Sequence, residues 1–156
     1  MSSTDVSTGA PTPLPATSEM WLEVVVVPIS DVERARAFYA TTLGWRLDAN
    51  LQGGGRWVVQ LTPPGSACSI WVGEGITSAA PGSSQGMILA VNDVVATRDA
   101  LIARGVDVSD VFHRDETGPV PGPDPEGRSY STFASFSDPD GNTWLLQEIR
   151  TRLPGR

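Results

Sequence analysis

Residues 21–45 read WLEVVVVPISDVERARAFYATTLGW, and residues 87–106, MILAVNDVVATRDALIARGV, repeat the same pattern. In both stretches an apolar run predicts a buried strand. Each run leads through an Asp into a segment of helical spacing that ends at a glycine, Gly44 or Gly105. A repeat of this kind is typical of two half-domains that share one function, so it decides the fold.

The first predicted helix carries a start signal. Ser30-Asp31-Val32-Glu33 fits a capping box, in which Ser30 caps the first turn and Glu33 reaches back to it. In both copies a strand and a helix are followed by three strands, which predicts an α+β fold. The expected strands are residues 21–29, 45–50, 56–62 and 67–72 in the first copy and 87–91, 106–114, 129–137 and 143–149 in the second, whose helix is expected at 93–104.

Composition also suggests how the chain is divided. Residues 1–19 are rich in Ser, Thr, Pro and Ala and lack the basic start and apolar centre of a secretory signal, so we expect a disordered tail. One domain is expected at 20–150, followed by a C-terminal tail at 151–156. Within the domain we expect module one at 20–73, a linker at 74–85 and module two at 86–150.

Charge and cysteine content limit the partners. The 156 residues carry 11 basic and 18 acidic side chains, a net charge of −7 at pH 7, with no basic stripe that would bind nucleic acid. No apolar run approaches the length of a membrane span. Cys68 is the only cysteine, so an intrachain disulfide is excluded, and the cytoplasm is the expected compartment.

The two copies differ in length. The first runs 34 residues from Asp31 to Gly65, whereas the second runs 48 from Asp93 to Gly141. The extra residues fall in 114–128, RDETGPVPGPDPEGR, which is rich in proline and glycine. A loop of this length inside a compact domain predicts a lid, a binding loop or a mobile segment.

Three segments resemble the vicinal oxygen chelate superfamily, which includes glyoxalase I, extradiol dioxygenases and bleomycin-resistance proteins. They are SDVERARAFYATTLGW at 30–45, VNDVVATRDALIARGV at 91–106 and FSDPDGNTWLLQE at 136–148. The resemblance implies two tandem βαβββ modules whose curled mixed sheets enclose a shared cavity. It leaves the chemistry open, because members isomerise, cleave, add thiols, epimerise or sequester a drug. Members build the cavity within one chain or across two, so a homodimer is an open hypothesis.

The resemblance also implies where a metal would bind. In metal-using members one ligand lies seven residues before the helix Asp and another lies four residues after the turn glycine. Here the corresponding residues are Val24, Ser69, Gly86 and Leu145. None of them offers the imidazole or carboxylate that a divalent ion needs, so we expect no metal and no other cofactor.

A shifted register gives a second candidate metal set, namely Glu23, Gln85 and Glu148. Strand side chains alternate between faces, so this shift turns the three groups away from the cavity unless a bulge intervenes. The alternative interpretation of Glu23 and Glu148 is a solvated or ion-paired strand end. A divalent metal is therefore the second choice.

Aromatic residues give a better indication of a site. By alternation Trp71 and Gln147 share a face with the empty metal positions, and we expect Trp57 and Phe133 to line the adjoining strands. Aromatic walls with a few polar groups suit a flat or apolar organic molecule. The alternative is that these rings belong to the packed core.

Three polar residues flank the long loop. His113, the only histidine, is placed to act as a general base or simply to pin the loop. Tyr130 is a candidate hydrogen-bond donor to a developing oxyanion, and Arg128 a candidate ligand for a carboxylate or phenolate. Arg128 can equally anchor the loop to Asp115 or Asp124.

The leading hypothesis is a metal-independent protein that binds a small organic molecule, with sequestration or resistance as its role. The ligand would lie between Trp57, Trp71, Phe133 and Gln147 under the loop. A second hypothesis is a cofactor-free cyclase or isomerase of a secondary metabolite, in which His113 or Tyr130 transfers a proton. The third is a metal-dependent lyase, isomerase or dioxygenase.

Overall fold

The computed structural model describes residues 11–155 and contains two modules, each a mixed sheet with its own helix. In the first module the strand order is β1-β4-β3-β2, and β1 runs parallel to β4. Its elements are β1 (Val24–Val26), α1 (Val32–Arg36), a π-helical segment (Ala37–Thr42), β2 (Arg46–Gly53), β3 (Arg56–Thr62) and β4 (Ser69–Glu74).

The second module repeats this arrangement with one strand more. Its order is β5-β9-β8-β6-β7, with β5 parallel to β9. Its elements are β5 (Met87–Val91), α2 (Val94–Ala103), β6 (Phe112–Asp115), β7 (Gly118–Pro121), β8 (Thr132–Ser137) and β9 (Thr143–Glu148). The predicted α+β fold with two βαβββ modules is therefore confirmed.

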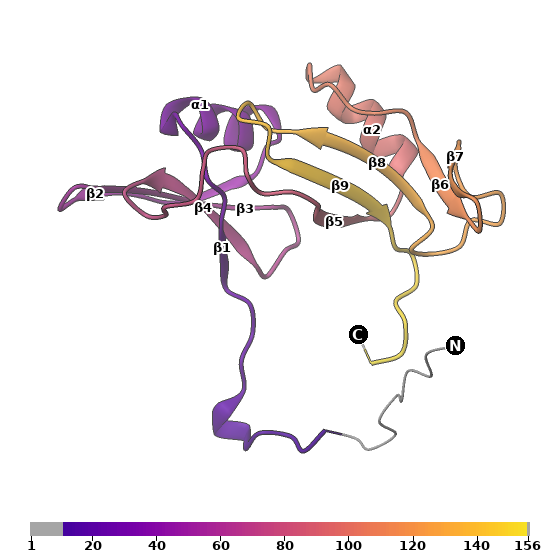
Figure 1. Cartoon of the computed structure of the whole chain (residues 1–156), viewed down its shortest axis with the longest axis horizontal. Coiled ribbons are helices and arrows are strands. Elements are labelled where there is room, and N and C mark those ends of the chain that lie inside the picture. The colour runs from indigo at the N-terminus through magenta and orange to yellow at the C-terminus, as the bar shows by residue number, and fades with distance from the viewer. Residues whose placement is uncertain (1–10, 156) are drawn as a thin grey trace.

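Figure 1 shows the two sheets side by side, with α1 and α2 on the same, upper side of the molecule. Within the modules α1 contacts β4, while α2 contacts β8 and β9. Each sheet thus has one face covered by a helix. We call the opposite side of each sheet its open face, and the chain that leads into β1 and the chain that leaves β9 lie on this side in the view.

Both helices begin at an aspartate. The Asp31 carboxylate accepts a hydrogen bond from the Arg34 backbone N–H at 3.1 Å, and Asp93 caps α2 in the same way through Ala96. Ser30, which we predicted to cap the first helix, instead donates its hydroxyl to the Asp140 carboxylate. The prediction was wrong by one residue, because a distant carboxylate binds the serine.

Three aromatic rings lie where the modules meet. The Tyr39 and Trp45 centroids are 5.1 Å apart, and Trp144 packs edge-on against Trp45 at 5.2 Å. The Trp144 indole N–H donates to the Tyr39 hydroxyl at 3.0 Å. Tyr39 comes from the π-helical segment and Trp144 from β9, so the cluster joins the two modules through one hydrophobic core.

A buried polar network surrounds this cluster. The Tyr39 hydroxyl donates to the Asp138 carboxylate at 2.7 Å, and the Asn142 amide donates to the same carboxylate at 2.8 Å. Asn142 also donates to the Pro28 carbonyl and accepts from the Ser84 N–H. Burial and the nearby Asp138 carboxylate raise the pKa of the Tyr39 phenol far above its usual value. The turn at 138–142 therefore binds the first module and the linker.

The long loop at 114–128 is only partly a loop. Residues 118–121 form β7, which pairs antiparallel with β6 and becomes the edge of the second sheet. Prolines at 119 and 121 are compatible with an edge strand, which has one unpaired side. The expectation of one continuous loop over 114–128 is corrected, because residues 118–121 form a strand.

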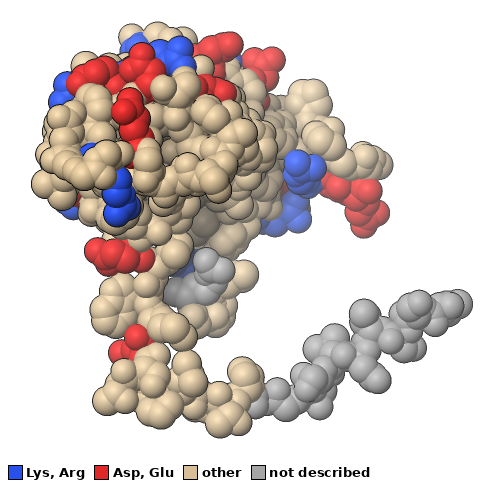
Figure 2. Space-filling view, turned by 60° about the vertical axis from the view of Figure 1, so that its left-hand side comes forward, with Lys and Arg blue, Asp and Glu red and all other residues tan. Residues whose placement is uncertain are grey.

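The predicted tail at 1–19 lies partly outside the described residues, which begin at 11. From there the chain forms an exposed 3-10 turn (Ala16–Ser18) and runs beneath the body to β1 (Figure 1). In Figure 2 acidic and arginine side chains intermingle on the face in view, without a broad basic area. Among residues 11–155, no helix has the length and apolarity needed to cross a bilayer.

Candidate functional site

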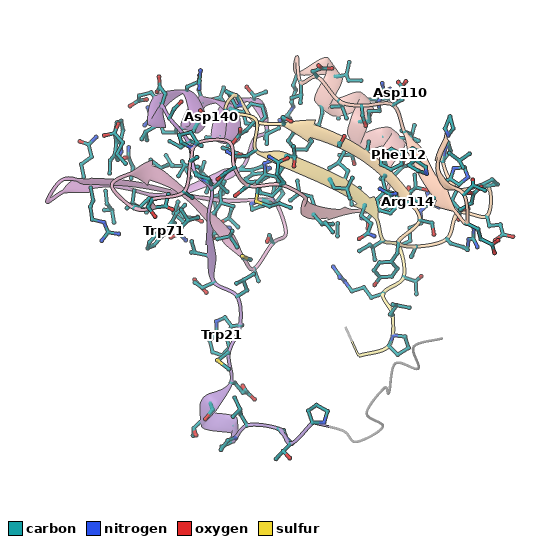
Figure 3. All side chains as sticks on the ribbon, in the orientation of Figure 1. Trp21, Trp71, Asp110, Phe112, Arg114 and Asp140 are labelled. Carbon is teal, nitrogen blue, oxygen red and sulfur yellow. The ribbon has the colours of Figure 1, made fainter. Side chains whose placement is uncertain are left out.

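The open face of the first sheet presents a tryptophan beside polar groups. Strand pairing places Val26, Trp71, Gln60 and Ala49 in one row across β1, β4, β3 and β2. The neighbouring rows that point the other way contain Ile70 and Leu61, which belong to the hydrophobic core. Trp71 is half-buried and lies below the sheet in Figure 3.

Hydrogen bonds join five side chains of this face into a chain, which we call the polar chain. The Trp71 indole N–H donates to the Gln60 amide oxygen at 2.9 Å, and the Gln60 amide N–H donates to the Ser69 hydroxyl at 3.4 Å. The Ser69 and Thr62 hydroxyls are 2.6 Å apart, and Thr62 donates to the Asp48 carboxylate. Ser69 stands at a position that carries a ligand in metal-using members of the superfamily, and here its hydroxyl forms hydrogen bonds with Gln60 and Thr62.

A β-bulge brings the carboxylate to this face. The β2–β3 pairing shifts between Leu47 and Ala49, and the extra residue, Asp48, bonds to Thr62 and Arg46. These two partners lower the pKa of the Asp48 carboxyl, which is therefore ionised at neutral pH. An ionised carboxylate only accepts, so Thr62 must donate to it and Ser69 must donate to Thr62. The direction of the polar chain is thereby fixed.

The open face of the second sheet carries a pair of phenylalanines. Phe112, Phe133, Gln147 and Ala90 form one row across β6, β8, β9 and β5. The Phe112 and Phe133 rings stack with centroids 5.5 Å apart. Phe133 is buried yet lies outside the main hydrophobic core. The next row holds Leu145, opposite Ile88.

The structure separates the four residues that we expected to form one wall. Trp57 pairs with Gln52 and Glu74, so it lies on the helix-covered face, and its indole donates to Asn50 at 2.7 Å. The prediction that Trp57 lines the cavity with Trp71 is corrected, because β3 alternates and Trp57 points to the opposite face.

The remaining three wall residues do not form one wall either, because only Phe133 and Gln147 are neighbours. Trp71 belongs to the first sheet, whereas Phe133 and Gln147 belong to the second. Figure 3 shows Trp71 far across the view from Phe112, the stacking partner of Phe133. One chain therefore presents two separate half-sites, which we call the tryptophan half-site (Trp71 with Gln60) and the phenylalanine half-site (Phe112 with Phe133).

The second metal set is not brought together. Glu148 faces the helix side, where its carboxylate accepts from the Val94 backbone N–H at 3.1 Å and pairs with Arg150. Gln85 donates to the Gly82 and Gly141 carbonyls, and Glu23 is exposed. Among the described residues no cluster of three His, Cys, Asp or Glu side chains could hold a metal. Glu23, Gln85 and Glu148 thus do not converge on one site in this structure.

His113 has a structural contact. It points to the face opposite that of Phe112, because the two are consecutive in β6. Its Nδ1 lies 2.8 Å from the Gly122 carbonyl oxygen, which ties β6 to the end of β7. This contact matches the interpretation of a loop-pinning histidine, and it places His113 away from both half-sites.

Tyr130 and Arg128 are also engaged. The Tyr130 hydroxyl accepts from the Leu153 N–H at 3.1 Å, and its φ of 71° is the left-handed region that few bulky residues adopt. Arg128 donates to the buried Asp124 carboxylate at 3.0 Å, which holds the pKa of Asp124 well below its usual value. Arg128 thus anchors its loop to Asp124, one of the two partners considered.

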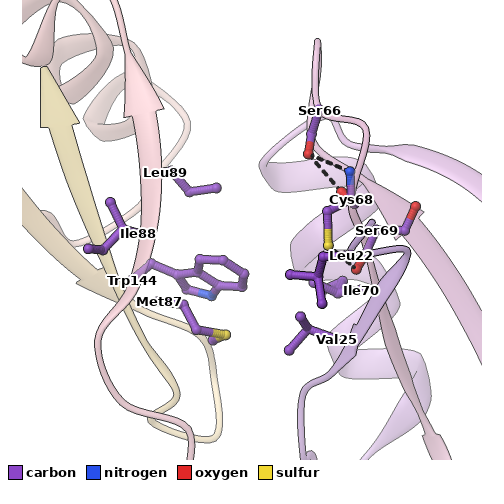
Figure 4. Close-up of a pocket in the computed structure, with 10 residues that line it drawn as sticks. All are labelled: Leu22, Val25, Ser66, Cys68, Ser69, Ile70, Met87, Ile88, Leu89 and Trp144. Atoms are coloured by element: carbon purple, nitrogen blue, oxygen red, sulfur yellow. Dashed lines mark hydrogen bonds between the residues drawn. The ribbon is translucent and has the colours of Figure 1, made fainter. Parts of the chain in front are cut away.

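An apolar pocket of about 290 Å³ lies between the modules. Figure 4 shows Val25, Cys68 and Ile70 on one side facing Met87 and Trp144 on the other. The thiol of Cys68 contacts the Ser69 carbonyl at 3.5 Å. The pocket offers a small ligand apolar surface with few polar contacts.

Four residues of the open faces were not predicted as site residues, namely Phe112, Arg114, Gln60 and Asp48. Phe112 and Arg114 could have been found from strand alternation. Residues two apart in a strand share a face, so these two side chains lie on the same face and His113 lies on the other. Alternation in β3 places Gln60 on the face opposite Trp57 in the same way. Asp48 carried no signal, because its position depends on a bulge.

The chain resembles proteins of known type over most of its length. A model of the glyoxalase/bleomycin resistance protein/dioxygenase superfamily matches residues 21–146. A glyoxylase-like domain-containing protein of Didymella fabae is 32% identical over 128 residues, which cover 78% of this chain and 88% of that protein.

Solved structures give a similar result. The crystal structure of TnmS3, an antibiotic binding protein from Streptomyces sp. CB03234, matches with a TM-score of 0.68 and 31% identity, covering 85% of this chain and 98% of that one. A glyoxalase/bleomycin resistance protein from the same strain matches with a TM-score of 0.64 and 32% identity, covering 82% and 100%.

Proposed function

The chain belongs to the glyoxalase/bleomycin resistance protein/dioxygenase superfamily, and we propose that it binds a small, flat organic molecule against the open faces of its sheets. An antibiotic or a toxic metabolite that the protein sequesters is the role we favour. TnmS3, at 31% identity, is an antibiotic binding protein, which supports this role. We further propose that binding needs no divalent metal, because Val24, Ser69, Gly86 and Leu145 offer no metal donors.

The observation that carries the proposal is the make-up of the two half-sites. Each has an aromatic surface, Trp71 or the Phe112–Phe133 pair, that does not belong to the main hydrophobic core. Each also has an amide at its side, Gln60 or Gln147. Sites for flat organic ligands combine apolar surface with a few fixed polar groups in this way.

Trp71 provides the test, with Trp57 as its matched control. Both indoles are half-buried and donate one hydrogen bond, but they lie on opposite faces. Calorimetric titration with the neutral probe 2-naphthamide should show saturable binding, weakened about fivefold to tenfold in Trp71→Ala because a stacking surface is lost. Trp57→Ala should leave the affinity unchanged. Equal weakening in both variants would contradict a ligand on the open face.

We also propose that two copies of the chain pair through their open sides. Met20, Trp21 and Leu22 are 81%, 76% and 67% exposed on the arm that precedes β1, and Leu51 and Ile88 are exposed on the open faces. Exposed apolar surface of this extent is typical of an interface. Each chain has both half-sites, so a two-fold arrangement sets the tryptophan half-site of one copy against the phenylalanine half-site of the other.

Light scattering coupled to a sizing column tests the pairing. We expect twice the chain mass of 16.5 kDa, and we expect the double variant Trp21→Ser, Leu22→Ser to shift the mass toward that of one chain. Ile102→Ser, which changes an exposed residue of α2 on the helix-covered side, serves as the control. A wild-type protein that elutes with the mass of one chain at high concentration would exclude the pairing.

A further inference from the structure

We propose that Arg114 makes the phenylalanine half-site a receptor for the carboxylate of an aromatic acid. The inference rests on the function proposed above, because it names the chemical class of the molecule that lies there. The Arg114 guanidinium carbon lies 5.7 Å from the Phe112 ring centroid and 6.0 Å from that of Phe133. Figure 3 shows Phe112 and Arg114 close together on the second module.

Arg114 differs from most arginines of this chain in its partners. Of the ten arginines within residues 11–155, six pair with a carboxylate and Arg104 donates to a backbone carbonyl. The Arg114 side chain makes neither an ion pair nor a hydrogen bond with any residue of that range. Arg56 and Arg152 share this property there, but neither lies over an aromatic ring. The five N–H donors of Arg114 are therefore available to a ligand.

Strand geometry turns Asp115, the acid next to Arg114 in the sequence, away from the guanidinium. Phe112 and Arg114 are two residues apart in β6 and share its open face, whereas Asp115 points to the other side. The Asp115 carboxylate accepts from the Thr117 backbone N–H at 2.7 Å and from its hydroxyl at 2.5 Å. Across the ladder Arg114 faces Pro119, which carries no charge. The guanidinium is held in place without being neutralised.

The shape of the guanidinium selects the ligand. A planar guanidinium next to aromatic rings keeps its N–H edges free, and such an edge binds a carboxylate through two parallel hydrogen bonds. The half-buried Phe112 ring offers apolar contact next to that edge. A flat aromatic body with one carboxylate satisfies both groups, whereas a neutral aromatic leaves the guanidinium unpaired.

The test compares 2-naphthoate with the neutral 2-naphthamide, which has the same ring and nearly the same shape. Calorimetric titration of the full-length protein should give about tenfold tighter binding of naphthoate, the effect of a hydrogen bond to a charged group. Arg114→Gln should reduce naphthoate binding to the level of the amide and leave the amide unaffected. Arg36→Gln, which removes the same charge from α1, should change neither affinity.

The outcomes separate this inference from the proposed function. Equal affinity for the two probes, unchanged in Arg114→Gln, overturns the role of Arg114 and leaves the binding of flat molecules intact. Failure of both probes to bind overturns both. Arg114→Lys adds a further criterion, because it keeps the charge and loses the planar fork. It should bind naphthoate more weakly than the wild type and more tightly than Arg114→Gln. Unfolding midpoints of all variants should match, since Arg114 is exposed.

Discussion

The Asn142→Ala variant is expected to lose about 3–5 kcal/mol of unfolding free energy. Asn142 is fully buried, and its amide makes three hydrogen bonds, to Pro28, Asp138 and Ser84. Alanine leaves the Ser84 N–H without a partner and deprives the buried Asp138 carboxylate of a donor. The Pro28 carbonyl also loses a donor and keeps only the Gly82 N–H. Unpaired buried polar groups cost more than the bonds themselves contributed. Because domains are stable by only about 5–15 kcal/mol, this loss is a large fraction of the total.

Urea unfolding followed by circular dichroism measures this loss. Asn50→Ala is the control, because Asn50 is exposed and accepts a single hydrogen bond from Trp57. We expect the control to change stability by less than about 1 kcal/mol. If the two variants unfold at the same urea concentration, the polar network at the module junction does not stabilise the fold as described.

Trp144→Ala is expected to cost a similar amount, about 3–5 kcal/mol, for a different reason. The Trp144 ring packs edge-on against Trp45 and Tyr39 with centroids 5.2 and 6.1 Å apart. It also borders the apolar pocket between the modules. Alanine removes these ring contacts between the two modules and enlarges that pocket. The loss of unfolding free energy grows with the volume left empty.

Two further variants separate packing from hydrogen bonding at this position. Trp144→Phe keeps most of the ring contact but removes the N–H that donates to the Tyr39 hydroxyl, so it should fall between the wild type and alanine. Leu153→Ala removes an apolar side chain that is 59% exposed, and should change stability by less than about 0.5 kcal/mol. Thermal unfolding of the wild type and the three variants gives the order of their stabilities. An alanine variant as stable as Trp144→Phe would contradict the packing account.

Local patterns were enough to predict the duplicated architecture. The apolar runs and Asp-to-Gly helical segments identified both modules, and β3 (Arg56–Thr62) and β5 (Met87–Val91) were predicted with their observed bounds. These signals survive because each depends on residues close in sequence. Ser30 was assigned the wrong role because its partner, Asp140, is 110 residues away. Likewise β7 was missed, because its prolines argue against a strand unless it is known to be an edge.

The half-sites were predicted less well than the fold. Alternation in β3 gives Trp57, Val59 and Leu61 one face and Val58, Gln60 and Thr62 the other. Arg56 belongs to the second set, which therefore includes all three polar residues of the strand. The open face could have been read from this set and Trp57 excluded. The partner of each strand could not be read in this way, because pairing is a property of the whole sheet. The bulge at Asp48 and the stack of Phe112 on Phe133 belong to this second class.

The pairing of the first strand of each module with its last has a consequence for folding. Val24 lies opposite Ser69, and Met87 lies opposite Trp144, so each pairing closes a long stretch of chain. The entropy of closing such loops must be overcome before the contact contributes any stability, which slows folding relative to a chain of hairpins. During synthesis β1 therefore has no partner until β4 has emerged, and β5 has none until β9 has emerged.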